Sequence, residues 1–418
     1  MSDNEKIKRV ISLTTGNSLK NGFMIQFPDG EMWNPVPDSV PGFTLKLKSA
    51  GSLKNTIFPP TELNVTEAYL FDEFDIEGDL FSVFETAYEL SGIKRGHSEN
   101  LSLLLKILSL PSSPRKKEKN FARRMSGQAH SLERDKEAVS YHYDMSNDLY
   151  KLWLDPKMVY SCAYFKTQDT PLKEAQTDKL DYICRKLALK EGEKLLDVGC
   201  GWGALVIHAA QNYGVTALGV TLSKNQAELA NSRIKQLGLA ERCRVEVRDI
   251  REMENEQFDK ISSVEMLHHI GYNSLPQYFE KIRQLLKPGG LSFQLAVTSN
   301  AAKGKYRGPL FAPKYFMPDY ELSPVGEYLK IAERGGFEVY DLENLRQHYM
   351  LTARHWLKNI ESGHDEIAGV TGEVMYRVYR LSMALMAYGF YSNMINLYHF
   401  VLQKTEGKGN YPPLTRWY

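Results

Sequence analysis

The sequence predicts an α/β fold, with a doubly wound and mostly parallel sheet in residues 130–418. Three observations favour this fold. Short apolar segments typical of buried strands alternate with amphipathic helical segments through the middle of the chain. The helical segments between these strands close on glycine. A glycine-rich turn also joins the first of these strands to its helix, as in nucleotide-binding folds of this class.

Helices of this domain are expected at 204–214, 224–238 and 323–336, where a glycine lies at or next to the end of each segment. A longer helical insertion near residues 343–392 separates the last two strands. Because a doubly wound fold binds its substrate above the carboxyl ends of the strands, we expect this insertion to act as a lid. Seven segments have the apolar character of strands: residues 194–199, 216–222, 243–249, 258–267, 290–297, 337–342 and 395–404.

Methionine and aromatic side chains such as Trp356, Met383 and Tyr388 are concentrated in the insertion. Such a stripe is typical of a helix packed into a protein core. Flexible methionines also line apolar channels that hold lipid tails. The sequence alone leaves both interpretations open.

Residues 1–112 are expected to form a small α+β domain. Apolar residues alternate over 23–27 and again over 43–47, and a Pro-Asp-Gly turn follows the first segment, as is typical of half-buried strands. Helices are expected at 80–90 and 101–110. No catalytic constellation is evident in this part of the sequence.

Residues 113–129 are expected to form a basic linker. The segment 113-SPRKKEKNFARR-124 holds six basic residues and one acidic residue. A charge run of this kind is usually a solvated linker. It also suits a patch for anionic lipid headgroups, where each basic residue near the surface contributes ~1 kcal/mol. Both interpretations stay open.

The composition is that of an ordinary globular protein, with 43% hydrophobic and 25% charged residues. The net charge of +1 argues against a nucleic-acid partner. No apolar run approaches the roughly 20 residues that span a bilayer, and the N-terminus lacks the apolar core of a signal peptide. The four cysteines show no metal-ligand or disulfide spacing, so we expect no metal site. We therefore expect a cytoplasmic protein that is peripheral to the inner face of the membrane.

The decisive segment is 195-LLDVGCGWG-203, an apolar strand that runs into a glycine-rich turn. Glycines such as Gly199 and Gly201 lack a β-carbon, so the chain can turn sharply and a ligand can approach the backbone. Asp197 lies just before the turn, where a carboxylate suits the cationic amino-acid end of S-adenosylmethionine better than a pyrophosphate.

The two following strands point to the same ligand. One ends in 219-GVTLS-223, without the acidic residue that a dinucleotide fold uses to bind ribose. The other ends in Asp249-Ile250, which places one polar and one apolar group to bracket an adenine. The sequence therefore predicts an S-adenosylmethionine-dependent methyltransferase.

Several segments carry a family resemblance. The chain resembles the cyclopropane fatty acid synthases and the related mycolic acid methyltransferases over roughly residues 20 to 400, most specifically at 159-VYSCAY-164 and in the glycine-rich turn. Further segments that carry the resemblance are 141-YHYDMSNDLYKLWLDP-156, 174-EAQTDKL-180 and 219-GVTLSKNQ-226. The resemblance implies a seven-stranded class I methyltransferase domain, preceded by a sterol-carrier-like domain. It also implies that the substrate is the cis double bond of an acyl chain, usually in a membrane phospholipid.

The motif and the resemblance together assign the cofactor contacts. The resemblance implies that Thr221 and Gln226 hold the ribose, a role that suits a hydroxyl and an amide because they can bind a diol without adding charge. Tyr160 and Ser161 are expected at the amino-acid end. The full set is Tyr160, Ser161, Asp197, Gly199, Gly201, Thr221, Leu222, Gln226, Asp249, Ile250 and Val264.

The chemistry implied by the resemblance sets requirements on the site. The double bond and the methyl donor must be held in line in a dry pocket, and aromatic faces can stabilise the resulting carbocation. A base must then remove a proton. In the family that base is implied to be a bicarbonate held by a Cys backbone, a Glu, two His and a Tyr. Cys162, His142 and Tyr349 stand at matching positions of this chain.

At two other positions that the resemblance assigns to bicarbonate contacts, this chain has a different residue from the family. His268 replaces the family's glutamate and is followed by His269, while Leu295 stands where the second histidine is expected. We therefore expect bicarbonate to be held poorly, and we predict that His268 takes the proton. The alternative is that the His pair is only a polar rim. Glu265 lies three residues upstream on the same expected strand, where its alternation does not match His268, so it is not expected to substitute.

The sequence thus predicts methylation of the cis double bond of an unsaturated acyl chain, giving a cyclopropane or a methyl- or methylene-branched chain. The expected partners are an unsaturated acyl lipid and, transiently, an anionic membrane surface, and the sequence leaves a homodimer open. Two other hypotheses remain. One is a methyltransferase that acts on an unrelated small molecule, and the other is a non-catalytic lipid-binding protein.

Overall fold

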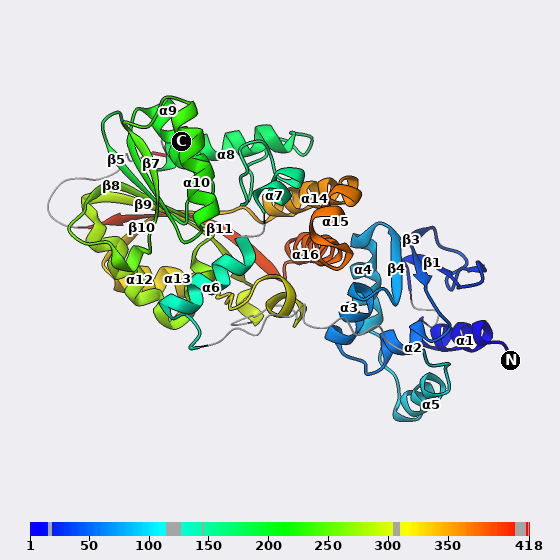
Figure 1. The fold of residues 1–418 in the computed structure, drawn as a ribbon. Coiled ribbons are helices and arrows are strands. Elements are labelled where there is room, and N and C mark those ends of the chain that lie inside the picture. The colour runs from blue at the N-terminus through cyan, green and yellow to red at the C-terminus, as the bar shows by residue number, and fades with distance from the viewer. Residues whose placement is uncertain (16–18, 114–126, 144–145, 304–309, 406–414, 417) are drawn as a thin grey trace. The chain divides into compact units, whose positions relative to one another are not determined.

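The computed structural model describes residues 1–15, 19–113, 127–143, 146–303, 310–405, 415–416 and 418, and its two compact units are shown in Figure 1. The first unit comprises residues 1–123, 309–316 and 371–388. The second comprises residues 124–308, 317–370 and 389–418. The basic segment at 113–124 therefore lies almost wholly outside the described residues.

The first unit contains a four-stranded sheet of order β2-β1-β3-β4. Strand β1 pairs parallel with β3, and the other two pairs are antiparallel. The strands β1 (Gly22–Gln26) and β3 (Pro41–Leu47) lie where the alternating pattern predicts strands. The sterol-carrier likeness of this unit stays a prediction. Its other elements are β2 (Met32–Trp33), β4 (Phe74–Gly78), α1 (Asp3–Thr15), α2 (Ser52–Ile57), α3 (Glu62–Leu70), α4 (Leu80–Ser91) and α5 (His97–Leu108).

Two buried arginines bind residues 371–388, which belong to helix α16 (Glu373–Tyr391), into the first unit. Arg377 donates a hydrogen bond of 2.7 Å to the carbonyl of Tyr69. Arg380 donates to the Tyr69 hydroxyl at 3.0 Å and to the Ile76 carbonyl at 3.1 Å. Such bonds to a charged donor offset the cost of burying it.

The second unit contains a seven-stranded sheet of order β10-β11-β9-β8-β5-β6-β7. Strand β11 is antiparallel to both of its neighbours, and all other pairs are parallel. This confirms the predicted α/β fold. The strands are β5 (Lys194–Val198), β6 (Thr216–Thr221), β7 (Cys243–Val247), β8 (Phe258–Val264), β9 (Leu286–Ser299), β10 (Phe337–Asn344) and β11 (Ile395–Lys404).

Helices cover both faces of this sheet, with α8 and α9 on one side and α12 and α13 on the other (Figure 1). Large apolar side chains such as Phe279, Ile282 and Phe337 are buried in the core between the sheet and helices α12 and α13. The helices are α6 (Leu132–Tyr143), α7 (Asn147–Trp153), α8 (Leu172–Lys186), α9 (Ala204–Tyr213), α10 (Lys224–Gln236), α11 (Leu267–Ile270), α12 (Leu275–Leu285), α13 (Val325–Arg334), α14 (Arg346–Ser362) and α15 (His364–Thr371).

One strand end differs from the prediction in a way that affects the site. The expected strand at 258–267 stops at Val264, and His268 lies in the short helix α11. Glu265 between them has a left-handed backbone, with φ of +59°. The expectation that Glu265 and His268 lie on one strand is therefore wrong, and strand alternation does not govern where either side chain points.

A buried ion pair ties α8 to the edge strand β10. The ammonium of Lys186, which is fully buried, lies 2.5 Å from Asp341 and 2.6 Å from Glu343. The ring of Tyr182 lies 4.9 Å from the same ammonium. Burial alone would raise the pKa of Asp341, but the hydrogen bond from Lys186 helps to hold that pKa below its ordinary value.

Replacing Lys186 with methionine should lower the free energy of unfolding by about 3–5 kcal/mol, because breaking a buried ion pair leaves its partner carboxylate uncompensated. Urea denaturation of Lys186→Met and the native protein would measure this loss. The matched control is Lys166→Met, since Lys166 pairs with Asp178 at 2.8 Å but is 64% exposed. Its expected loss is below about 1 kcal/mol. Equal stability of the two variants would contradict the role of the buried pair.

Candidate active site

A pocket of about 470 Å³ lies at the carboxyl ends of the parallel strands of the second unit. Its wall is formed by the segments that follow β5, β6, β7 and β8. Clefts at this edge of a doubly wound sheet are the usual binding sites of the fold, and this volume suits a small-molecule cofactor.

The glycine-rich turn forms one wall of the pocket. Gly199 has φ of +76°, and its N–H donates to the Val220 carbonyl at 2.9 Å. A β-carbon at Gly199 would lie 2.4 Å from the sulfur of Met266. Both the backbone angle and the space therefore require glycine at this position.

Asp197 is a buried carboxylate beside this turn. It accepts a hydrogen bond of 2.7 Å from the Ser262 hydroxyl. Burial raises the pKa of Asp197 to about 6, although Ser262 and the charge of Lys179 act in the opposite direction. A cationic ligand group would favour the ionised form, so the site is suited to a positive charge.

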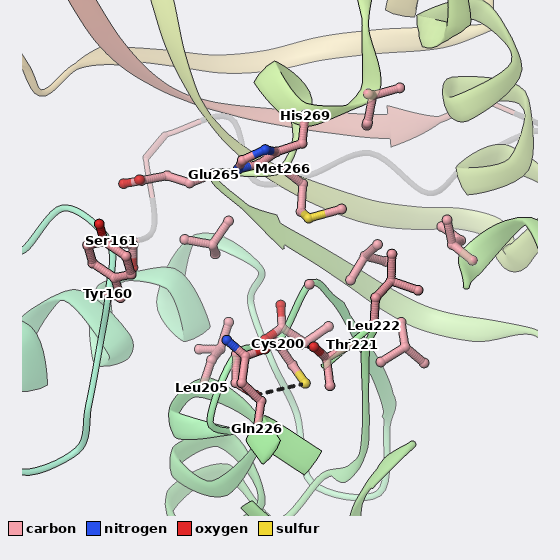
Figure 2. Close-up of a pocket in the computed structure, with 18 of the residues that line it drawn as sticks. Tyr160, Ser161, Cys200, Leu205, Thr221, Leu222, Gln226, Glu265, Met266 and His269 are labelled. Atoms are coloured by element: carbon pink, nitrogen blue, oxygen red, sulfur yellow. Dashed lines mark hydrogen bonds between the residues drawn. The ribbon is translucent and has the colours of Figure 1, made fainter. Parts of the chain in front are cut away.

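The segments after β6 and β7 carry the groups assigned to ribose and adenine. The Thr221 hydroxyl donates to Gln226 Oε1 at 2.7 Å, and both side chains lie in the lower part of the pocket in Figure 2. Asp249 accepts from Arg251 with both oxygens, at 2.9 Å and 2.7 Å. Ile250 next to it is a buried apolar side chain. These groups are thus held in place by neighbouring side chains.

All of the predicted cofactor residues line this one pocket. Their individual contacts with a cofactor stay predictions. Those residues are Tyr160, Ser161, Asp197, Gly199, Gly201, Thr221, Leu222, Gln226, Asp249, Ile250 and Val264.

Two of the predicted catalytic residues, Cys162 and Tyr349, form hydrogen bonds to Glu265, which was not among the residues predicted from the sequence. The backbone N–H of Cys162 donates to Glu265 Oε1 at 2.8 Å, and the Tyr349 hydroxyl donates to Glu265 Oε2 at 2.5 Å. Glu265 lines the pocket, and its carboxylate extends toward Ser161 and Tyr160 in Figure 2.

One signal in the sequence could have identified Glu265. This signal is a carboxylate near the carboxyl end of a strand, a feature that Glu265 shares with Asp197 and Asp249. All three lie at the same edge of the sheet.

The predicted catalytic histidines are placed differently. His269 lines the pocket, whereas His268 is buried and is not among the described residues that line it. The carbonyl of His268 accepts from the Glu321 N–H at 2.9 Å. His142 lies in α6, but its side chain falls outside the described part of the chain. The roles of all three in proton transfer stay predictions.

The electrostatics single out Glu265 among these groups. Burial raises the pKa of Glu265 to about 7, against the opposing effects of Tyr349, the Cys162 N–H and Lys179. Burial and the Glu265 charge raise the pKa values of the Cys162 thiol and the Tyr349 phenol well above their ordinary values, so both groups keep their protons. Glu265 can therefore exchange a proton near neutral pH, and its two neighbours act as donors.

Lys179 is the buried cation of this region. It donates to the Ser161 hydroxyl at 2.8 Å. Burial lowers the pKa of Lys179, while the charge of Glu265 acts in the opposite direction. Lys179 thus partly compensates the carboxylates around it.

Aromatic side chains surround Tyr160 at the pocket wall. The Tyr160 ring lies 5.0 Å from that of Trp153 and 5.2 Å from that of Trp356, in edge-to-face arrangements. Tyr349 lies 6.0 Å from Trp356 and stacks on Phe390 at 4.5 Å. Of these rings, Tyr160 lines the pocket, where an aromatic face is suited to stabilising a positive charge on a substrate, and the others pack around it.

Comparisons with known proteins agree with this geometry. Residues 130–400 match the family model for mycolic acid cyclopropane synthetase. A probable fatty acid methyltransferase of Pseudomonas putida is 39% identical over 293 residues, which cover 69% of this chain and 74% of that protein. Probable fatty acid methyltransferase Rv3720 of Mycobacterium tuberculosis is 32% identical over 370 residues, 86% of each chain. The crystal structure of mycolic acid cyclopropane synthase CmaA1 complexed with SAH and CTAB superposes with a TM-score of 0.61 and 30% identity, covering 64% of this chain and 98% of that one.

The affinity for S-adenosylmethionine should fall as the pH drops through about 6, the pKa of Asp197, because the protonated carboxyl loses its attraction for the cationic ligand. Binding near that pH should release a proton, which isothermal titration calorimetry detects in buffers of different ionisation enthalpy. Asp197→Asn should bind about 10- to 100-fold more weakly, as expected for the loss of a charged hydrogen-bonding partner.

The control is Asp178→Asn, because Asp178 forms a surface pair with Lys166. This variant should bind S-adenosylmethionine like the native protein, with the same pH dependence. Native affinity in a folded Asp197→Asn variant would show that Asp197 does not contact the cofactor.

Proposed function

The chain belongs to the mycolic acid cyclopropane synthetase family of S-adenosylmethionine-dependent methyltransferases that modify lipid acyl chains, and from this premise we propose that it methylates a cis double bond of an unsaturated acyl chain carried by a phospholipid. The observation that carries the proposal is the convergence in one pocket of the cofactor residues, an aromatic wall and an ionisable carboxylate. The product is a cyclopropane or a methylene-branched chain.

The residues present fit S-adenosylmethionine. Asp197 would hold the cationic amino-acid end, Thr221 and Gln226 would hold the ribose, and Asp249 with Ile250 would bracket the adenine. When bound, the cofactor supplies an electrophilic methyl group. Gly199 admits the ligand because it has no side chain.

The chain's own residues then meet the demands of an alkene, which is a poor nucleophile. Tyr160 lines the pocket and is held from behind by Trp356, so this wall would exclude water and help to hold the double bond near the methyl donor. The ring of Tyr160 would stabilise the cationic carbon by ~1–2 kcal/mol when desolvated. A saturated methyl branch would require a separate hydride donor, so this chain alone produces the ring or the methylene branch.

Mass spectrometry of lipids tests this function. Cells that contain unsaturated phospholipids and express the protein should accumulate acyl chains heavier by one CH₂ group. Proton NMR of the extracted chains separates the two products, because a cyclopropane has characteristic high-field protons and a methylene branch has vinylidene protons.

Gly199→Val is the control for that experiment, because its side chain would collide with Met266 and block the cofactor turn. No mass gain is expected from it. Transfer of the methyl group to a non-lipid molecule, or no transfer by a native protein that binds S-adenosylmethionine, would contradict the proposal. These outcomes correspond to the small-molecule and non-catalytic hypotheses.

We further propose that the protein reaches its lipid at an anionic membrane surface, on the cytoplasmic side. Within the described residues, no helix has the length and apolar character needed to cross a membrane. The charge run at 113–124 supplies six basic residues for headgroups. That segment supports surface contact by its composition alone.

Binding to vesicles should require anionic lipid and should weaken with salt, because exposed charges are screened beyond ~10 Å at 0.1 M. Co-sedimentation with vesicles of phosphatidylcholine, with and without phosphatidylglycerol, measures this. The triple variant Arg115→Gln, Lys116→Gln, Lys117→Gln should bind less. If the native protein binds neutral and anionic vesicles equally at every salt concentration, the segment is only a linker.

A further inference from the structure

We propose that the Glu265 carboxylate occupies the place of the bicarbonate that the family resemblance implies, and that Glu265 is the catalytic base that removes the proton from the methylated acyl chain. The inference rests on the proposed function and deepens it at one residue. It replaces the expectation that His268 takes the proton.

The hydrogen-bond donors carry the first step of the argument. The Cys162 N–H and the Tyr349 hydroxyl stand at positions where the resemblance implies contacts to a bound anion. In this chain they donate to Glu265 Oε1 at 2.8 Å and to Oε2 at 2.5 Å. Each carboxylate oxygen has two lone pairs, so one on each oxygen remains after these bonds. Both donors are therefore already bonded to a carboxylate that belongs to the chain, and neither is left for a free bicarbonate.

The backbone supplies a second, independent observation. Glu265 has φ of +59°, a conformation that favours glycine and in which other residues are strained. Its N–H donates to the Leu295 carbonyl at 2.8 Å, which fixes this turn against β9. Strain of this kind persists where the surrounding structure imposes it, most often at functional sites. The turn directs the carboxylate to the pocket wall beside Ser161 and Tyr160 (Figure 2).

The surroundings keep Glu265 ready to accept a proton. The groups that face it are the Tyr349 hydroxyl, the Cys162 N–H and the Lys179 ammonium. Burial opposes ionisation of Glu265, and these three groups favour it, which leaves the pKa at about 7. A base whose pKa lies near the working pH is the most effective in proton transfer.

The reaction balances with Glu265 as the only base. The π electrons of the alkene would form a bond to the methyl carbon while the bond from that carbon to the sulfonium sulfur breaks and leaves its electron pair on sulfur, so the neighbouring chain carbon would become cationic. Glu265 then takes a proton from the added methyl group, and the electron pair of the broken C–H bond closes the three-membered ring. If a hydride first moves from the methylated carbon to the cationic one, the same proton loss leaves a methylene branch. The proton passes from Glu265 to water after the product leaves.

Two substitutions at this position separate the catalytic role from a structural one. Glu265→Gln keeps the shape and removes the base, so turnover should fall by ~10²–10⁴ while S-adenosylmethionine affinity is retained. Glu265→Gly suits the left-handed backbone and empties the place of the carboxylate. It should be as inactive as Glu265→Gln without added anion, and bicarbonate or acetate should restore part of its turnover. The native protein should gain nothing from either anion.

Glu73→Gln is the matched control, because Glu73 is a buried glutamate of the first unit whose carboxylate accepts a hydrogen bond from Asn55 at 3.1 Å. It should keep turnover close to that of the native protein. A second measurement does not depend on activity. Infrared difference spectra between pH about 6 and about 8 should show loss of a protonated carboxyl band, centred at the pKa of Glu265, and Glu265→Gln should lack that band.

The outcomes separate this inference from the proposed function. Normal lipid product from Glu265→Gln, or strong stimulation of the native protein by bicarbonate, would overturn the role of Glu265 alone. Loss of turnover in His268→Ala with normal turnover in Glu265→Gln would assign the proton to His268. A native protein that binds S-adenosylmethionine but yields no modified lipid would overturn both proposals.

Discussion

The active-site pocket depends on carboxylates that are brought together at one edge of a parallel sheet and only partly compensated. Asp197, Asp249 and Glu265 all lie at this edge, because parallel strands end side by side. Asp249 is neutralised by Arg251, whereas Asp197 and Glu265 share the influence of the buried Lys179. Their pKa values of about 6 and about 7 reflect burial that is not fully offset. A pocket of this kind is suited to a ligand that brings a positive charge of its own.

The sequence predicted the parts of the molecule that local patterns determine. The strands of the large sheet and the turn at Gly199 follow from apolar runs and from glycine chemistry, which act over a few residues. Local patterns could not predict the hydrogen bond between Glu265 and Tyr349, because Tyr349 lies in α14, 84 residues further along the chain. The early end of β8 was missed for a related reason, since glutamate seldom adopts the left-handed turn that ends this strand.

In the insertion before the last strand, aromatic residues pack in the core and also support the pocket, so the two interpretations of this segment do not exclude each other. Trp356 is fully buried, as the core interpretation requires, and its ring contacts Tyr160, which lines the pocket. Tyr349 on the same helix packs against Trp356 and Phe390 while its hydroxyl reaches Glu265. Helix α14 thus places a rigid aromatic layer behind the groups that line the pocket. Rigid packing of this kind fixes the hydroxyl of Tyr349 within the narrow range that proton transfer requires.

A tethered carboxylate also accounts for the other departure of this site, at Leu295. A free anion must lose its hydration and its freedom of motion each time it binds, and it needs several donors to offset both. A glutamate side chain loses less on each catalytic cycle, because folding has already placed it. Its two oxygens are served by the Cys162 N–H and the Tyr349 hydroxyl, so no further donor is required from β9. The carbonyl of Leu295 accepts from the Glu265 N–H and holds the strained turn. If Glu265 is the base, as we propose, the leucine at 295, where the resemblance implies a histidine, and the carboxylate at 265 have one explanation.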